Sequence, residues 1–361
     1  MSVQTPRAVT PNAVRGPSPI RELLNSYPVR RIFRALVTIY LVTTATFMLI
    51  RLMPGNPISV LVNDLVSRGT MGYQEAMDYA SSMFQVDFSA PLWKQYLEFL
   101  VGLAKGDFGK SISSMGTKVT TLIMQFLPWT LFVVTMSLCI SFALGTLLGM
   151  FVAYRRETWI DHVLTIIAAI ISAVPNYLIA ILLLVFGGVR WGWFDIASMR
   201  GSFSPGMVPS FSLSFFADVL YHATLPMITY ILTTLGSWML TMKASTNAAL
   251  GEDYVTVAKA RGLTDGRITM GYVGRNAILP LVTQLAISIG FVVGGSILIE
   301  SLFVYQGVGK LLSAAVGSRD YPLMQGLFLV ITCSVIVANL LADLLYSKLD
   351  PRIRLSGKRR S

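Results

Sequence analysis

Long apolar stretches constrain the fold of this chain more than any other feature of its sequence. A helix needs about 20 predominantly apolar residues to cross the roughly 30 Å hydrocarbon core of a bilayer. Six stretches come near this length, at 31–52, 127–154, 162–189, 223–243, 279–305 and 323–347. Hydrophobic residues make up 54% of the 361 residues and charged residues only 13%, which does not fit a water-soluble domain. The sequence therefore predicts an all-α integral membrane protein with six transmembrane helices.

These stretches divide the chain into five parts. They are a basic, Pro-rich arm (1–28), a first transmembrane helix (29–53), an extracytoplasmic region (54–126), a core with the other five helices (127–347) and a basic tail (348–361). The arm is expected to be disordered. Within the extracytoplasmic region, residues 72–84 and 91–103 carry apolar side chains at helical spacing. We expect two short amphipathic helices there, which lie on the outer membrane surface or cap the bundle.

The distribution of basic residues orients the predicted helices. The formal net charge is +11, and Lys and Arg gather in the arm, in the Arg155–Arg156 turn, in the loop 244–279 and in the tail. Cytoplasmic loops of membrane proteins carry such an excess of positive charge. Both termini and the loop 244–279 are therefore predicted to be cytoplasmic. Because this bias accounts for the high net charge, we predict no nucleic-acid partner.

The sequence gives little support to catalytic or metal chemistry. His162 and His222 are the only histidines, and neither stands beside a cysteine. Cys139 and Cys333 both fall within apolar stretches, where they act as small hydrophobes. Residues 104–111, AKGDFGKS, match a relaxed phosphate-loop pattern, but an amphipathic helix precedes them where that motif needs a buried strand. We interpret the match as chance, and predict a chain without catalytic site, metal or bound cofactor.

The loop 244–279 contains one short pattern typical of a helix. Tyr254, Val257, Ala258 and Arg261 follow the spacing i, i+3, i+4 and i+7, and Gly262 stands where a helix is expected to stop. A short helix of this kind offers a compact knob that fits a groove on another protein. The same spacing also fits a solvated cytoplasmic connection, so the periodicity alone leaves both interpretations open.

Several segments of the chain resemble one family. EDYVTVAKARGL followed by RNAILPLVT is similar to the EAA loop of binding-protein-dependent ABC importers, in the form of the peptide-type permeases. The resemblance continues in FMLIRLMPGNP, PLWKQYLEFLVGLAKGDFGKSI, LIESLFVYQGVGKLL, RDYPLMQG and ADLLYSKLDPRIR, which appear in family order. The chain departs from the general EAA pattern in two places. Asp253 and Tyr254 replace two alanines, and the spacing from Gly262 to Leu279–Pro280 is longer.

The resemblance implies a fold, partners and a contact surface. The fold is that of type I ABC importers, in a bacterial or archaeal inner membrane. The partners are a second homologous permease subunit in a heterodimer, two ABC ATPase subunits that bind ATP and Mg, an extracytoplasmic substrate-binding protein, and membrane lipid. The EAA loop of such permeases is a coupling helix that sits in a cleft of the ATPase subunit. The implied contact positions are Glu252, Tyr254, Val257, Ala258, Ala260, Arg261 and Gly262.

The substrate path and the cargo are less well defined by the sequence. Asn176 and Tyr177, after Pro175, and Trp238 are candidates to face the path, although ordinary packing or kink formation also explains them. Motifs shared by the subfamily do not separate peptides from oligosaccharides or nickel as cargo. An ion-coupled secondary carrier would be expected to show intramembrane carboxylates, which are not evident. The glycine pairs Gly145/Gly149 and Gly290/Gly294 are predicted to allow close helix packing.

Overall fold

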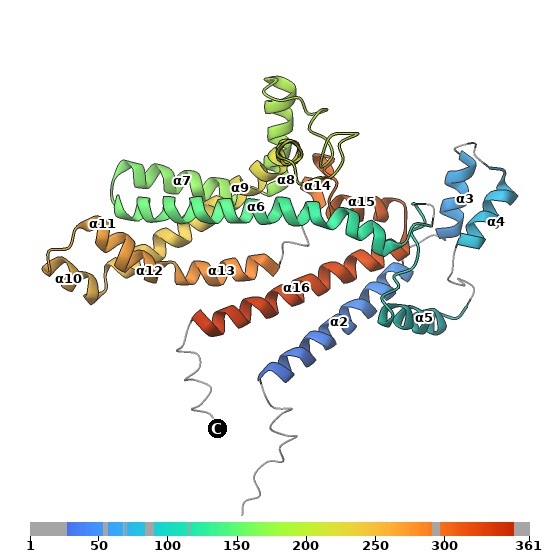
Figure 1. The fold of residues 1–361 in the computed structure, drawn as a ribbon, viewed down its shortest axis with the longest axis horizontal. Helices are drawn as coiled ribbons and strands as arrows, with labels where there is room; N and C mark the ends of the chain where they lie inside the picture. The colour runs from blue at the N-terminus through green and yellow to red at the C-terminus, as the bar shows by residue number, and fades with distance from the viewer. Residues whose placement is uncertain are drawn as a thin grey trace, which may run out of the picture.

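The structure is a computed structural model that describes residues 27–52, 57–67, 69, 71–83, 90–114, 116–290 and 297–349. Within these residues all regular secondary structure is helical, apart from one antiparallel bridge between Lys110 and Lys118, and loops join the helices. The helices form an elongated bundle (Figure 1). Most of the predicted arm and tail, 1–26 and 350–361, lies outside the described residues.

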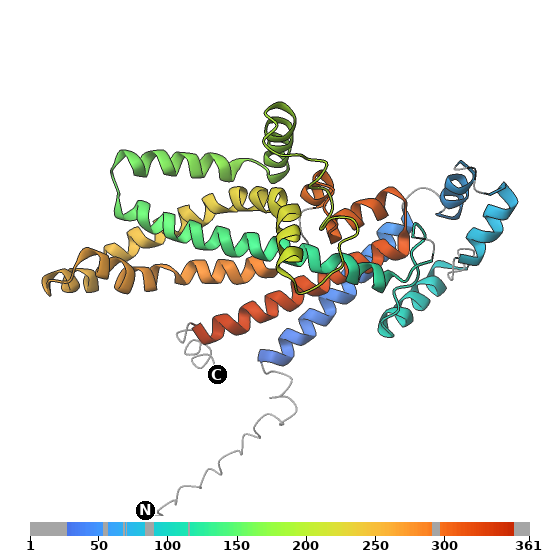
Figure 2. The same ribbon diagram turned by 45° about the horizontal axis from the view of Figure 1, so that its top comes forward.

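Four helices are long and apolar enough to cross a membrane. The helices α2 (Tyr27–Leu52), α6 (Val119–Tyr154), α9 (Leu213–Leu250) and α16 (Tyr321–Leu349) contain these candidate spans. α6 and α7 (Trp159–Ala173) both pack along α9, and α16 packs beside α2 (Figures 1 and 2). These helices confirm a multi-pass helical membrane protein. Of the predicted span 279–305, the structure describes only α13 (Leu279–Gly290) and α14 (Ile297–Leu302) with the residues that follow α14.

The predicted span 162–189 is not one straight helix. α7 ends at Ala173, and α8 (Asn176–Leu182) continues as the π-helical segment η1 (Leu183–Arg190) at an angle of 100° to α7. Pro175 explains the break, because a proline disfavours the helical conformation of the residue before it, and Val174 is extended here (φ −79°, ψ 127°). If the bent pair counts as one span, the described residues hold five candidate spans.

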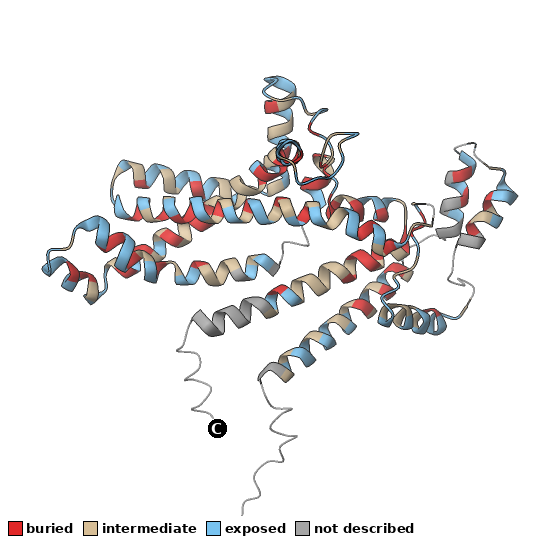
Figure 3. Ribbon diagram, viewed as in Figure 1, coloured by how far each residue is buried: buried red, intermediate tan, exposed pale blue. Residues whose placement is uncertain are grey.

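Glycines allow α6 and α9 to approach closely. A Cβ atom on Gly145 would collide with Trp238, and one on Gly149 would lie 2.7 Å from Cβ of Met242. The prediction of close packing at this glycine pair is therefore confirmed, whereas Gly294 of the second pair lies outside the described residues. Buried residues gather where α6 and α9 meet (Figure 3).

Residues 54–126, which were predicted to be extracytoplasmic, contain the two predicted amphipathic helices and a third one. α4 (Tyr73–Met83) and α5 (Leu92–Ala104) occupy the predicted positions. The helix α3 (Pro57–Ser67), which was not predicted, packs on α4 through the buried side chains of Val62, Leu65, Ala76 and Ala80. α5 instead lies against α2, next to its end at Leu52 (Figure 1).

Short helices complete the fold. Between α9 and α13 lie α10 (Asp253–Ala260), α11 (Asp265–Arg267), the π-helical segment η2 (Ile268–Val273) and α12 (Gly274–Ala277). Between α14 and α16 lies α15 (Val308–Gly317). α10 to α12 form one end of the bundle, and α15 lies toward the other end (Figure 1).

Candidate coupling site

The loop after α9 forms a defined helix where one was predicted. α9 ends at Leu250, and Glu252 takes an extended conformation (φ −79°, ψ 149°) from which α10 begins at Asp253. The acidic side chain of Asp253 lies in the first turn and Lys259 in the last, which is the charge order that the helix dipole favours.

A glycine terminates α10. Gly262 has a φ of +75°, in the left-handed region. Its N–H donates to the carbonyl of Lys259 at 2.9 Å, and the N–H of Leu263 donates to the carbonyl of Ala258 at 3.3 Å. These two bonds form a Schellman motif, which satisfies carbonyls that would otherwise lack partners at the helix end. The predicted helix stop at Gly262 is confirmed, and the loop leaves α10 in a fixed direction.

One face of α10 is anchored to the bundle. Val255 and Ala258 are buried in a cluster that also contains Trp238 and Met242 of α9. The other buried members are Ala249, Ile268, Val273, Ala277 and Leu281. Because α9, α10, η2, α12 and α13 all contribute side chains to this one cluster, packing joins α10 to both helices that flank the loop.

The opposite face of α10 is exposed. Val257 is 57% exposed. Of the other predicted contact residues, Glu252, Ala260, Arg261 and Gly262 are exposed, Tyr254 is half-buried and Ala258 is buried. The four residues with the spacing i, i+3, i+4 and i+7 therefore do not share one exposed face, because Val257 and Arg261 are exposed whereas Ala258 is buried. Ala258 points inward with Val255, an anchor that the sequence analysis missed, while Thr256 and Lys259 are exposed beside Val257.

The three candidates for the substrate path lie in two parts of the fold, Trp238 in α9 and the other two at the start of α8. Trp238 is 2% exposed and packs edge-to-face on Phe142 of α6, with ring centroids 5.3 Å apart. It therefore occupies a packing position between α6 and α9, the alternative that the sequence left open. Asn176 and Tyr177 begin α8, just beyond the bend, where Asn176 is half-buried and Tyr177 is 37% exposed.

An ion pair joins α7 to α9 in the half of the bundle that carries α10. The ammonium of Lys243 contacts the carboxylate of Asp161 and also donates to Oγ1 of Thr165 at 2.8 Å. Asp161 accepts a second bond from the N–H of Glu157, 3.1 Å away. The sequence analysis placed Lys243 at the end of an apolar stretch and missed this pair. Asp161 and Lys243 are far apart in the sequence, and no local pattern around either residue indicates its partner.

A buried carboxylate organises the helices at the other end. Glu300 of α14 is fully buried and accepts from the N–H of Gly309 at 2.7 Å and of Lys310 at 3.1 Å, in the first turn of α15. Thr130 of α6 donates to its Oε1 at 2.8 Å. A carboxylate at a helix N-terminus pairs with N–H groups that have no partner inside the helix. A side chain on Gly307 would collide with this carboxylate, so the glycine is required for the approach.

A second buried carboxylate, Asp320, holds the segment after α5. Its Oδ2 accepts from the hydroxyls of Ser111 at 2.5 Å and Ser113 at 2.8 Å, and its Oδ1 accepts from the N–H of Leu323 in the first turn of α16. Ser111 closes the stretch 104–111 that matches the phosphate-loop pattern. Helix α5, which ends at Ala104, leads into that stretch where the phosphate-loop motif needs a strand, and Ser111 binds the carboxylate of Asp320. Both features agree with the interpretation of a chance match.

Comparisons with known proteins agree with this architecture. Residues 145–355 match the family described as "Binding-protein-dependent transport system inner membrane component". The oligopeptide transport system permease protein AppB of Bacillus subtilis is 30% identical over 331 residues, which cover 91% of this chain and 99% of that protein. The dipeptide transport system permease protein DppB of Escherichia coli K12 is 28% identical over 339 residues, 90% of this chain and 98% of that protein.

A third relative has the same extent. The di/tripeptide transport system permease protein DppB of Pseudomonas aeruginosa is 28% identical over 339 residues, 91% of this chain and 98% of that protein. The family match spans α7 to α16, including α10 and both flanking helices. The chain therefore belongs to the binding-protein-dependent transport system inner membrane components, the transmembrane permease subunits of ABC importers.

Proposed function

We propose that this chain is a permease subunit of an ATP-driven ABC importer of peptides, and that it lines half of the translocation pathway. A second homologous permease subunit supplies the other half, two ABC ATPase subunits bind ATP and Mg, and an extracytoplasmic binding protein delivers the cargo. Peptides are the favoured cargo because the relatives are named oligopeptide, dipeptide and di/tripeptide permeases. Import of oligosaccharides or nickel by the same fold is the alternative.

The observation that carries this proposal is the two-sided character of α10. Its inner face, Val255 and Ala258, is built into the cluster with Trp238 and Met242, and its outer face presents Val257 to solvent. A solvated connection would need neither an anchored side nor a Schellman stop. A helix that must receive displacement from another protein needs both, since the anchored side passes the movement to α9 and α13.

The arrangement of the basic segments supports a cytoplasmic position for α10. The start of α2, the Arg155–Arg156 turn and the end of α16 lie toward the end of the bundle that carries α10 (Figure 1). With a positive-inside bias, this end faces the cytoplasm and both termini lie there. We propose six transmembrane helices, with α13, α14 and the residues between them as part of the fifth. Movement of α10 then shifts the packing of α9 against α6 between an inward-facing and an outward-facing arrangement.

Site-directed crosslinking tests the docking surface. Cys139 and Cys333 are replaced by alanine, and Val257→Cys is introduced into this background in the intact transporter. A thiol-reactive crosslinker is expected to join position 257 to an ATPase subunit in membranes. Val208→Cys provides the matched control, because Val208 is also strongly exposed, at 75%, but lies in the loop between η1 and α9. It is expected to give no ATPase adduct.

The same variants distinguish the proposal from its competitors. Labelling of Val257→Cys by an impermeant thiol reagent added outside the cell would contradict the cytoplasmic position of α10. Peptide uptake by this chain alone, driven by an ion gradient and without any ATPase subunit, would favour a secondary carrier. Retention of radiolabelled peptide by the cognate binding protein, compared with oligosaccharide and nickel, identifies the cargo.

A further inference from the structure

Helix α5 has three distinct strips of side chains. The first faces α2: the hydroxyls of Tyr96 and Thr44 are hydrogen-bonded at 2.6 Å, and the ring of Phe47 lies 5.2 Å from that of Tyr96 and 5.4 Å from that of Phe99, centroid to centroid. The same side buries Gln95, whose amide donates to the carbonyl of Ala90 at 2.7 Å. These contacts fix the rotation of α5 on α2, and with it the direction of the other two strips.

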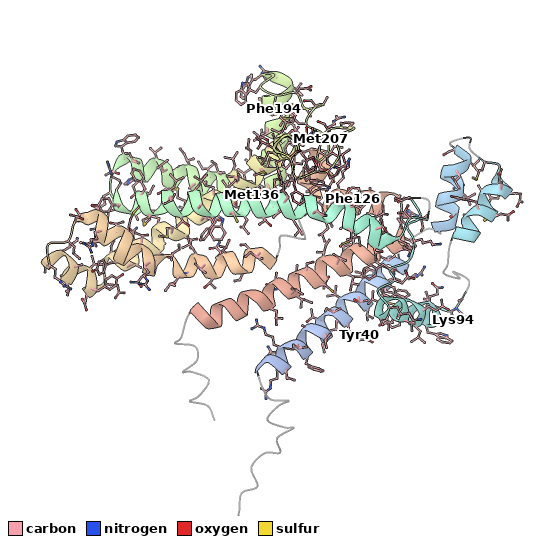
Figure 4. All side chains as sticks on the ribbon, in the orientation of Figure 1. Tyr40, Lys94, Phe126, Met136, Phe194 and Met207 are labelled. Atoms are coloured by element: carbon pink, nitrogen blue, oxygen red, sulfur yellow. The ribbon has the colours of Figure 1, made fainter. Side chains whose placement is uncertain are left out.

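The second strip is apolar and exposed. Trp93, Leu97 and Val101 follow one another at intervals of four residues, and they are 66%, 52% and 52% exposed. The third strip is charged: Lys94 and Glu98 are each displaced by one residue from the apolar strip, and both are exposed. Figure 4 labels Lys94 on α5 and Tyr40 on the neighbouring α2. An apolar strip with a charged strip on one flank is typical of a helix at a membrane–water boundary.

The contacts with α2 set the depth of α5. Thr44 and Phe47 precede Leu52, the last residue of α2, by eight and five residues, or about 12 and 7 Å at 1.5 Å per residue. The apolar span Val29–Leu52 has 24 residues, and at this rise it is about 36 Å long, slightly more than the roughly 30 Å of hydrocarbon. The segment of α2 that holds α5 is therefore level with one leaflet of the membrane and not above it.

We infer that the strip Trp93, Leu97 and Val101 is a lipid-contact surface that inserts among the acyl chains of the outer leaflet. Lys94 and Glu98 then lie toward the headgroups and water, and Trp93 lies at the interfacial level where tryptophan is enriched. Lipid is favoured as occupant because α2, the apolar candidate span that holds α5, itself exposes Met48, Leu49 and Leu52 near the same end. The choice of the outer leaflet rests on the proposed topology, in which Leu52 lies at the extracytoplasmic end.

This surface gives α5 a definite role in the importer. The strip with Tyr96 and Phe99 packs against α2, and the strip with Trp93, Leu97 and Val101 contacts lipid. The segment that follows α5 is hydrogen-bonded to Asp320, just before α16. The extracytoplasmic region is then moored to the membrane surface at α5. A region that only touched water would have no reason to expose three large apolar side chains in one row.

Photocrosslinking in intact membranes tests the inference with the whole transporter in place. The photoreactive residue p-benzoylphenylalanine replaces Leu97 in one variant and Glu98 in a matched one. After illumination, the purified chain is digested and its α5 peptide is analysed by mass spectrometry. The Leu97 variant is expected to carry phospholipid adducts in several-fold greater yield than the Glu98 variant. The same probe at Val101 repeats the measurement if the Leu97 variant is not inserted into the membrane.

Each outcome decides for or against the lipid surface. Equal lipid adducts at positions 97 and 98, or none at either position, would overturn it. Adducts at 97 and 101 with a second permease subunit or with the binding protein would overturn it as well, and would assign the strip to a protein interface. Failure of the proposed transport function is recognised separately, because it removes ATP-driven uptake and the Val257→Cys adduct while leaving lipid adducts on α5 unchanged.

Discussion

Thr130 and Glu300, 170 residues apart in sequence, are joined by a 2.8 Å hydrogen bond in which the threonine hydroxyl donates to the carboxylate. The same hydroxyl accepts from the N–H of Val308 at 2.8 Å. Thr130, with its one hydrogen and its lone pairs, thus links α6 to both α14 and α15. Because Thr130 and Glu300 are fully buried, water has no access to replace either bond.

Removal of this hydroxyl is expected to destabilise the bundle. Thr130→Val keeps the shape of the side chain but leaves a carboxylate oxygen and the N–H of Val308 without that partner, at a cost of about 1–3 kcal/mol. The thermal stability of the purified transporter in detergent, followed by size-exclusion chromatography after heating, measures the loss. Thr229→Val is the matched control, since Thr229 is equally buried but, among the described residues, its hydroxyl bonds only to the Leu225 carbonyl of its own helix. Equal stability of the two variants would show that the link between α6 and α14 contributes little.

Asp320 is expected to control the mobility of the segment between α5 and α6. The two carboxylate oxygens of Asp320 accept from Ser111, Ser113 and Leu323. Asp320→Asn replaces one of these oxygens by an NH2 group, which donates and does not accept, so the hydrogen bonds to that oxygen are lost. Hydrogen exchange of the amides in residues 107–118 should become faster, whereas exchange in α9 should not change. Asp195→Asn is the control, because Asp195 is exposed and its carboxylate accepts from the nearby N–H of Ala197. An unchanged exchange rate in Asp320→Asn would contradict the pinning role.

The pair Asp161 and Lys243 is expected to behave as a coupled unit. Their side chains are 10% and 19% exposed, so loss of one partner leaves a poorly solvated charge on the other. Asp161→Asn and Lys243→Gln should each lower thermal stability, and the double variant should lose less than the sum of the two, with a coupling of about 1 kcal/mol. A double-mutant cycle measures this difference. Strict additivity would mean that the contact between α7 and α9 does not depend on the ion pair.

The sequence was sufficient to predict those features of the fold that depend on local patterns. Apolar length predicted the long helices, and helical spacing with Gly262 predicted both α10 and its end. The bend after α7 follows from Pro175, but its angle of 100° depends on what α8 packs against, which no local pattern contains. The six-helix count remains a prediction, because the fifth stretch includes residues outside the described part of the chain.

Residues whose roles depend on distant partners could not be predicted. Glu300 and Asp320 each occur in segments that resemble the permease family, yet nothing in the sequence shows that their carboxylates are buried or that they bind Thr130 and Ser111. Ala258 is a related case. Small residues suit close approach to another protein and close packing inside the same protein equally well, and only the fold shows that Ala258 faces the cluster around Trp238.

The backbone conformation of Gly262 yields a prediction that separates local geometry from surface contact. No neighbouring atom lies within 4 Å of a Cβ built at this position, so a side chain there has space, but at a φ of +75° any residue other than glycine is strained. The left-handed conformation costs about 1–2 kcal/mol for an ordinary residue, more for a β-branched one, and less for asparagine.

Gly262→Val should therefore loosen the end of α10 and lower peptide uptake per ATP hydrolysed, whereas Gly262→Asn should retain most of the coupling. Gly266→Val is the control, because Gly266 is also exposed with open space around it but has no positive φ. Uptake and ATP hydrolysis measured together in proteoliposomes decide the matter, and an equal loss in the valine and asparagine variants would assign the effect to a blocked contact surface and not to the helix stop.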